Sequence, residues 1–330
     1  MLSRLFIAPL LALLLSAIQP APAARAQGID AAAVAEAVRS VVVVLPRWRN
    51  VRPGFAPRSG DPRVAPEGSG VAILAGGYVV TNDHVLGDAI SVSLRLADGR
   101  RAPAEIVGRH KATDIALLKT TADLTVAEPG PMPGIAAPVC AIGNPFGRGL
   151  SVSCGVVSAI GRANAGFNEI EDFIQTDAAV NPGGSGGALV DGRGRFVGMV
   201  SAIFAQGSDA NIGVNFAASR RLVDRVVRDL AEFGAVREGT AGIDVRPLTP
   251  EEAAVNAGVG VVEVARDGPA LAAGIEAGDI VTRVGDRPVT APGEFHAALF
   301  RHRPGAEVQM TVRRGDVERQ VTVTLAPQAP

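Results

Sequence analysis

The sequence predicts a mostly β fold, built as a sandwich or barrel, for the larger part of the chain. Short β-rich runs separated by turn residues recur between residues 69 and 214, and no helical pattern interrupts them before residue 219. A parallel sheet of βαβ units would need helices between those runs. The chain has 330 residues, and a domain averages ~150 residues, so about two domains are expected.

The first 26 residues are predicted to be a secretory signal peptide. Arg4 precedes an apolar run over residues 5–18, and Ala24-Arg25-Ala26 matches the small-residue cleavage pattern. An uncleaved membrane anchor is the alternative, which the short run and Pro9 disfavour. We therefore expect a bacterial periplasmic or secreted protein, with membrane association only if this segment is retained.

Residues 27–234 form the first predicted domain. Helical spacing over residues 29–38 leads into a strand at 40–45, and residues 46–68 are rich in Pro, Arg and Gly, which predicts a long loop. The helix at 219–233 is the clearest, because Leu222, Val226 and Leu230 share one face and Gly234 ends it. The strands between these segments are predicted at 71–74, 78–81, 90–94, 104–107, 115–118, 173–176, 196–200 and 212–214.

Residues 237–328 form a second predicted domain of α+β type. Its length of about 90 residues is sufficient for an independent core. Two helices are predicted, at 269–274 and 292–301, among strands near 260–265, 280–284, 308–313 and 317–325.

The composition excludes several classes of function. The formal net charge is -1 with no basic patch or acidic tail, so nucleic acid is not an expected partner. The histidines and cysteines lack the spacing of metal ligands, so neither a metal nor another cofactor is expected.

Cys140 and Cys154 are the only cysteines of the chain. The turn formers between them, at 143–149, predict a hairpin centred near Gly147 that brings the two cysteines opposite each other. An oxidising compartment would permit a disulfide. Two separate buried thiols are the alternative.

The segment NPGGSGG at 181–187 is a candidate nucleophile loop. Glycines around Ser185 allow a sharp turn that exposes the hydroxyl. They also let the N–H groups of Gly183, Gly184 and Ser185 point into one space, where they could hold an oxyanion. A flexible Gly-Ser turn without catalytic function is the alternative.

A serine nucleophile needs a base, and the base needs an orienting carboxylate. His84 follows a predicted strand and is the best placed of the four histidines. His110 lies between Arg109 and Lys111, which predicts an exposed side chain, and His296 and His302 are expected to be solvated. Asp114, at the start of an apolar strand, could be buried cheaply only if it is hydrogen-bonded, as pairing with His84 would allow. Asp83 is the rival, although neighbours in extended chain point apart.

The order His84, Asp114, Ser185 on a β-rich chain is that of the chymotrypsin-like double β-barrel. An α/β-hydrolase, which GGSGG would also fit, places its acid and histidine after the serine. TNDHV (81–85), DIALLK (114–119), AIGNPFG (141–147), FIQTDAAVNP (173–182) and the serine motif together resemble the HtrA-type (DegP/DegS-like) serine proteases. AGIEAGDIV (273–281) and RPG (303–305) resemble the PDZ domain of that family.

The resemblance implies roles for these residues. Ser185 would be the nucleophile, His84 the base and Asp114 its orienter, with an oxyanion hole at the N–H groups of Gly183 and Ser185. The family usually has Asn in place of Gly184 and Ala in place of Asn215, and a larger apolar residue within the segment of the predicted PDZ peptide-binding loop, which comprises Gly258, Val259, Gly260 and Val261.

The resemblance also suggests substrates and partners. Ala179, six residues before the nucleophile, would lie at the base of the S1 pocket, which Val180, Ile203 and Ile212 would complete. Because this set offers no carboxylate, a basic P1 side chain would be left unpaired, and small aliphatic P1 residues are expected. The family implies a homotrimer that cleaves unfolded or regulatory exported proteins and binds peptide ends at its PDZ domain. A catalytically silent chaperone or peptide-binding protein is the alternative.

Overall fold

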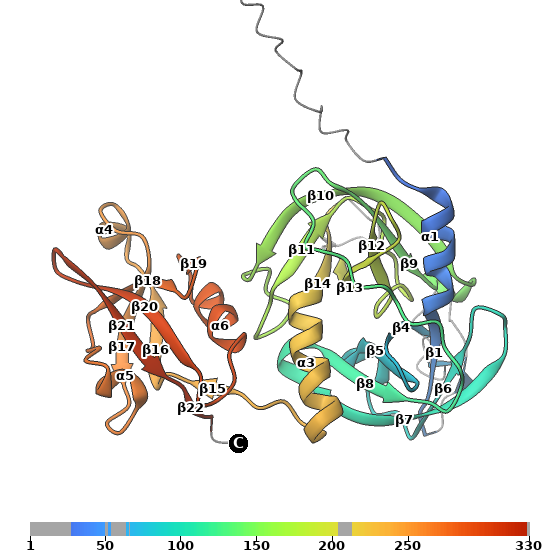
Figure 1. Ribbon diagram of the computed structural model, residues 1–330, viewed down its shortest axis with the longest axis horizontal. Helices are drawn as coiled ribbons and strands as arrows, with labels where there is room; N and C mark the ends of the chain where they lie inside the picture. The colour runs from blue at the N-terminus through green and yellow to red at the C-terminus, as the bar shows by residue number, and fades with distance from the viewer. Residues whose placement is uncertain (1–27, 50–51, 54–63, 66, 204–212, 329–330) are drawn as a thin grey trace, which may run out of the picture.

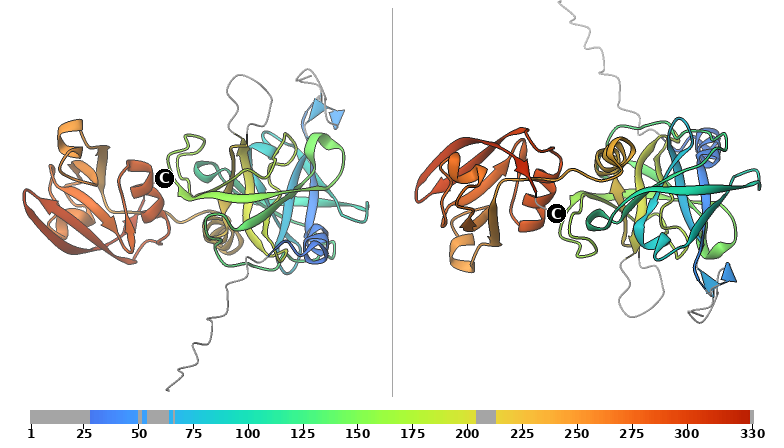
Figure 2. Two further views of the ribbon diagram at one scale, coloured as in Figure 1. Left: turned by 90° about the horizontal axis from the view of Figure 1, so that it is seen from above. Right: turned by 90° about the horizontal axis from the view of Figure 1, so that it is seen from below.

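Two closed β-barrels and a C-terminal α+β unit make up the part of the chain that the computed structural model describes, which is residues 28–49, 52–53, 64–65, 67–203 and 213–328. The two barrels lie side by side, and the C-terminal unit lies beyond one long helix, α3, on the side of the second barrel (Figure 1). Views from above and below show the same separation of the two bodies (Figure 2).

The first barrel closes in the strand order β1-β4-β5-β8-β7-β6. Apolar residues alternate into its interior, where Val42, Val79 and Leu118 are almost fully buried. Its strands are β1 (Val41–Arg47), β4 (Gly68–Leu74), β5 (Tyr78–Asn82), β6 (Ser91–Arg95), β7 (Arg101–His110) and β8 (Ile115–Lys119), with α1 (Ala31–Ala37), η1 (Val38–Ser40), α2 (Asp83–Leu86), η2 (Lys111–Thr113) and the strand pair β2 (Arg52–Pro53) and β3 (Val64–Ala65) around them.

The second barrel closes in the order β10-β11-β14-β13-β12-β9. Helix α3 (Arg220–Phe233) follows it, capped at its start by the Ser219 hydroxyl and ended by Gly234 at φ 71°. The apolar face of α3 packs on both barrels. The strands are β9 (Pro138–Gly143), β10 (Ser151–Arg162), β11 (Phe173–Thr176), β12 (Ala188–Asp191), β13 (Phe196–Ile203) and β14 (Asn215–Ser219), with η3 (Pro145–Gly147) in the β9–β10 hairpin.

The C-terminal unit contains a sheet in the order β16-β17-β18-β20-β21, with β19 paired to β18. Strand β16 is therefore an edge strand. The elements are β15 (Gly239–Thr240), β16 (Ile243–Pro247), α4 (Pro250–Ala253), β17 (Val259–Val264), α5 (Pro269–Ala272), β18 (Ile280–Val284), β19 (Arg287–Pro288), α6 (Pro292–Phe300), β20 (Glu307–Arg314), β21 (Val317–Thr324) and β22 (Ala326–Pro327).

The predicted mostly β architecture is confirmed, whereas the expected exposure of His110 is wrong. His110 is 9% exposed rather than solvated. Its ring stacks on Phe300 with 5.4 Å between ring centroids, and its Nε2 lies 3.0 Å from Glu238 Oε1. The charged neighbours in sequence misled the prediction, because the contacts that bury His110 come from the distant segment around residues 238 and 300. No helix in the described part of the chain is long and apolar enough to span a bilayer.

Candidate active site

His84 and Asp114 are joined by two hydrogen bonds at the end of the first barrel. The imidazole Nδ1 lies 2.6 Å from Asp114 Oδ2, and the backbone N–H of His84 donates to Asp114 Oδ1 at 2.8 Å. The side chain of His84 is 54% exposed and that of Asp114 is 14% exposed. Since an ionised carboxylate can only accept hydrogen bonds, Nδ1 carries the proton and Nε2 is left as the basic nitrogen.

The backbone of Asp114 is held in an unusual conformation. Asp114 ends the short η2 helix at φ 54° and ψ 42°, the left-handed region that few residues other than glycine adopt. The side-chain amide of Asn82 donates to Asp114 O at 2.9 Å and Asp114 Oδ2 at 3.0 Å, and also reaches Ser201 Oγ at 3.2 Å. Asn82 thus fixes both ends of the aspartate and links the first barrel to the second.

Asp83, the rival carboxylate, has a different partner. It forms an ion pair with Arg109, whose Nη1 also donates to Gly87 O at 2.8 Å. Asp83 and His84 lie in helix α2 rather than in extended chain, so the ion pair with Arg109, and not strand alternation, takes the Asp83 carboxylate out of the competition for His84.

Ser185 lies in the tight loop between β11 and β12. Its Oγ donates to Ser201 O at 3.3 Å, and no hydrogen bond joins Oγ to the His84 ring among the described residues. The next residue must be glycine, because Gly186 has φ +85° and a Cβ there would lie 2.1 Å from Ser69 O. Hydrogen bonds between such groups are often long before substrate binds and shorten in the Michaelis complex.

The glycines before Ser185 are held from the first barrel by Ser69. The Ser69 hydroxyl donates to Gly183 O at 2.7 Å and accepts from Asn144 N at 2.9 Å, and its backbone N–H donates to Ser185 O at 2.9 Å. The N–H of Gly184 donates to Asn181 O at 2.8 Å. Gly184 was expected to contribute an oxyanion donor, and this expectation is corrected because its N–H is already used within the turn.

A cavity of about 560 Å³ brings the expected catalytic residues together. It draws its walls from both barrels. His84, Lys111, Asp114, Phe167, Asn168, Asn181, Pro182, Ser185 and Ser201 line it. The side chains expected to serve as nucleophile, base and orienting carboxylate thus line one cavity.

The residues expected to form the S1 pocket divide into two groups. Ala179 and Val180 line a cavity of about 200 Å³ that also contacts Gly184, behind the nucleophile loop. Ile203 ends β13, where its backbone pairs with Asn215, and Ile212 lies outside the described residues. The Asn215 side chain is buried and donates to Ala178 O at 3.0 Å, so it braces the segment that carries Ala179.

Cys140 and Cys154 lie opposite each other on β9 and β10 and form a disulfide. The hairpin that they cross-link also supports the nucleophile loop. The Ser153 hydroxyl accepts the N–H of Ala179 at 3.0 Å, and Phe146 N donates to Pro182 O at 2.7 Å.

The predicted PDZ peptide-binding loop, Gly258, Val259, Gly260 and Val261, is not an open edge. Strand β17 pairs with β16 through Val259 and Gly260, and the same two residues pair with β18 on the other side. Its backbone groups are consequently used in the sheet, and a peptide cannot be added there. This prediction is corrected, and the free edge next to helix α6 belongs to β16.

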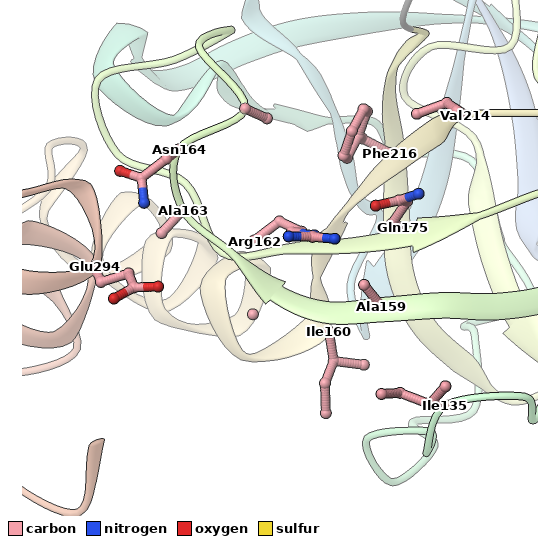
Figure 3. A pocket seen from close by; sticks show the side chains of 12 residues that line it. Ile135, Ala159, Ile160, Arg162, Ala163, Asn164, Gln175, Val214, Phe216 and Glu294 are labelled. Atoms are coloured by element: carbon pink, nitrogen blue, oxygen red, sulfur yellow. The ribbon is translucent and has the colours of Figure 1, made fainter. Parts of the chain in front are cut away.

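A larger cavity, of about 710 Å³, lies between the second barrel and α6 (Figure 3). Arg162, Gln175 and Phe216 come from strands of the barrel, Glu294 comes from α6, and Arg162 lies between Glu294 and Gln175 in this view. Although this cavity is larger than the one at Ser185, none of the proposed catalytic groups lines it, and we do not assign it as the active site. Within the described ranges, no three His, Cys, Asp or Glu side chains cluster as metal ligands would.

Sequence reasoning missed Ser69, Asn82 and Ser201. Each is a polar residue at most 5% exposed inside or beside an apolar strand. Burial of such a group requires partners, so polar residues within predicted core strands were the signal that could have found them.

Comparison with known proteins places these features in a family. The model of the trypsin-like peptidase domain matches residues 68–199, and that of the PDZ domain matches residues 212–325. A probable periplasmic serine endoprotease DegP-like of Brucella suis is 36% identical over 281 residues, covering 82% of this chain and 54% of that protein. The periplasmic pH-dependent serine endoprotease DegQ of Escherichia coli is 34% identical, covering 78% of this chain and 59% of that protein.

Comparison with solved structures gives the same family. The HtrA-type protease AlgW with tripeptide is 35% identical with a TM-score of 0.72, covering 90% of this chain and 97% of that one. The serine endoprotease from Yersinia pestis is 32% identical with a TM-score of 0.64, over 90% and 97% of the two chains. The chain spans little more than half the length of the curated relatives it matches.

Proposed function

Because the chain belongs to the HtrA-type family of trypsin-like serine proteases with a PDZ domain, we propose that it is an exported serine endopeptidase with Ser185 as nucleophile, His84 as base and Asp114 as orienter. The observation that carries the proposal is the doubly hydrogen-bonded pair of His84 and Asp114 in the same cavity as the Ser185 hydroxyl.

The proposed reaction has two steps. His84 Nε2 takes the Ser185 proton while Oγ attacks the substrate carbonyl carbon, and the N–H groups of Gly183 and Ser185 stabilise the oxyanion. The tetrahedral intermediate collapses as the imidazolium protonates the leaving amine, which breaks the C–N bond and leaves an acyl-enzyme. Water, deprotonated by His84, then attacks the ester and restores the serine. Asp114 keeps Nδ1 protonated and offsets the charge of the imidazolium.

The P1 preference proposed is for small aliphatic residues. Ala179 and Val180 supply only apolar atoms to the cavity behind the nucleophile loop, and no carboxylate lines it. An Arg or Lys side chain there would lose its hydration without gaining an ion pair.

The peptide-binding groove of the PDZ domain is proposed to lie between the free edge of β16 and helix α6. An extended peptide adds to a sheet where backbone N–H and C=O groups are unpaired, and in this sheet β16 is at the edge while β17 is internal. Exposed ends of unfolded exported proteins have the chemistry to bind there. Such binding fits protein quality control in the periplasm, the compartment that the relatives' names give for them. A homotrimer is proposed from the family alone.

Cleavage of an unfolded protein tests the enzyme against the alternative of a silent binding protein. The wild-type chain is expected to cut reduced, carboxymethylated protein after Val, Ala or Ile, as read by mass spectrometry of the products, and Ser185→Ala should cut nothing. Wild-type protein that binds the unfolded chain without cutting it would favour the binding protein, and cleavage mainly after Arg would refute the P1 assignment.

A further inference from the structure

Beyond the catalytic groups, the structure assigns a substrate preference to Lys111: we propose that its ammonium group selects substrates with an acidic side chain close to the scissile bond. The inference rests on the proposed function, because it concerns the same cavity. Lys111 lines that cavity together with His84 and Ser185. It is one of only two lysines in the chain.

The position of Lys111 relative to the catalytic groups is fixed by the backbone. Lys111 begins the η2 turn, and its carbonyl accepts the N–H of Asp114 at 3.0 Å. The side chain thus starts three residues from the carboxylate that orients His84. Because Lys111 and Ser185 line the same cavity, a peptide bound there would lie beside this flexible four-carbon side chain.

The loop over residues 163–171 forms the facing wall of this subsite. Phe167 and Asn168 line the same cavity as Lys111. The loop is anchored to the η2 turn, because Ile170 N donates to Ala112 O at 2.9 Å and the Asn168 amide reaches Thr113 O at 3.4 Å. Lys111 is exposed, and it lies at the edge of a cavity whose opposite wall is this anchored loop.

The charges around the subsite leave Lys111 without a carboxylate partner. Asp114 is hydrogen-bonded to His84, and Asp83 is paired with Arg109. The carboxylate of Glu171, on the facing loop, is buried and accepts the N–H groups of Ala165, Phe167 and Asn168. Across the described residues, no ion pair reaches the Lys111 ammonium.

An unpaired cation beside a partly enclosed peptide site favours a negative substrate side chain and disfavours a positive one. The ammonium would form a charge-assisted hydrogen bond with a Glu or Asp carboxylate. The ion pair would be partly exposed, so a Glu substrate should gain about three- to fivefold over its Gln counterpart. Raising the ionic strength should reduce that ratio, as screening requires.

The experiment compares quenched fluorescent peptides with Val at P1 and Glu, Gln or Lys placed in turn from P3 to P3′. At one position the wild type should show the order Glu, Gln, Lys in kcat/KM, with the ratio falling in high salt. Lys111→Glu should reverse the order at that position, and Lys111→Gln should remove it. Lys119→Glu makes the same charge change on β8, where Lys119 lies over the Tyr78 ring, and should keep the wild-type order.

A second readout separates this inference from the proposed function. The affinity of Ser185→Ala for the same peptides, measured by fluorescence anisotropy, should follow the same order and should lose it when Lys111→Gln is added. Wild-type protein that binds selectively but never hydrolyses would sink the proposed function alone. Equal kcat/KM and equal affinity for Glu, Gln and Lys at all positions, or an order unchanged in Lys111→Glu, would overturn the role of Lys111.

Discussion

At the residue scale, Ser69 is the side chain that most directly positions the nucleophile loop without contacting substrate. Its hydroxyl links Gly183 O and Asn144 N across the two barrels. Orientation of the Gly183–Gly184 peptide depends on this bond, and the glycines on either side supply no stiffness of their own. Family members usually have Asn in place of Gly184. Glycine lacks that side chain, so this loop depends more than theirs on contacts from outside it, such as those of Ser69.

Ser69→Ala should lower kcat about tenfold while leaving KM within about twofold, because the oxyanion donors act mainly in the transition state. The unfolding free energy should fall by about 1–2 kcal/mol, as both hydrogen bonds of the buried hydroxyl are lost. Steady-state kinetics on a Val-P1 peptide measure the split.

Ser40→Ala is the matched control for Ser69→Ala. Ser40 is 2% exposed and its hydroxyl donates to Ala37 O at 2.7 Å, away from the cavity. Ser40→Ala should lower the free energy of unfolding by an amount similar to that of Ser69→Ala, and it should leave kcat unchanged. An equal loss of kcat in both variants, or none in Ser69→Ala, would contradict the positioning role.

The sequence singled out three residues that line one cavity, but it did not reveal the residues that support them. His84, Asp114 and Ser185 carry motifs, whereas Asn82 and Ser69 act through partners 32 and 114 residues away in the chain. Local sequence cannot show such partners. The burial of His110 was missed for the same reason, since Glu238 and Phe300 bury it.

At the scale of the element, the β9–β10 hairpin supports the nucleophile loop, and the disulfide cross-links this hairpin. Cys140 is fully buried and Cys154 is exposed on the other strand, 14 positions further along the chain. Cross-linking a loop of this size restricts the unfolded chain by about 3 kcal/mol on the chain-entropy account.

The double substitution Cys140→Ala with Cys154→Ala should therefore lower the free energy of unfolding by about 3 kcal/mol. Denaturant unfolding with and without a phosphine reductant measures it. Reductant should lower the free energy of unfolding of the wild type to that of the variant, and it should leave that of the variant unchanged. A wild type whose unfolding does not respond to full reduction would contradict the stabilising role.

The strands of the C-terminal sheet show how topology decides a binding site. The sequence predicted a strand near residue 260, and the glycines there suggested a peptide-binding loop. Which strand lies at the edge depends on pairing between distant segments, such as Arg246 with Gly260, and the local pattern does not reveal it.

Peptide binding at β16 predicts a local change in amide exchange. An excess of a decapeptide with an apolar last residue and a free carboxylate should slow exchange in Ile243–Pro247. Amides of Val259 and Gly260 should change little, since they lie inside the sheet. Mass-spectrometric hydrogen exchange measures both segments, and protection of residues 258–261 without protection of β16 would contradict the assignment.

At the scale of the whole molecule, Asp229 joins the protease domain to the PDZ domain. Its carboxylate is fully buried on α3, forms an ion pair with Arg225, and lies 2.5 Å from Arg303 of the C-terminal unit. Burial raises the pKa of Asp229, but the Arg237 N–H and the guanidinium groups of Arg225 and Arg303 outweigh it, so the pKa is lowered below its ordinary 3.8.

A lowered pKa means that this contact stabilises the docked arrangement above the ordinary value of 3.8 and is lost as the pH falls through the folded value. Small-angle scattering should show the two bodies separating below that pH. Asp229→Asn should separate them already at pH 7 and cost about 3 kcal/mol, because it leaves the Arg225 guanidinium, which is 11% exposed, without its carboxylate partner.

Asp224→Asn is the control for Asp229→Asn. Asp224 lies on the same helix, and its carboxylate pairs with Arg220 at 2.6 Å within α3. It should leave the scattering profile at pH 7 unchanged. Identical profiles for Asp229→Asn and the wild type at neutral pH would show that Asp229 does not hold the two bodies together.

The catalytic assignment as a whole depends on one reactive hydroxyl activated across the two barrels. A fluorophosphonate probe, followed by mass spectrometry of the labelled peptide, reads that reactivity directly. We predict that wild-type protein is labelled on Ser185 alone, and that His84→Ala lowers the labelling rate by at least about a thousandfold while the protein remains folded by circular dichroism. Labelling on another serine, or equal rates with and without the His84 imidazole, would contradict the assignment.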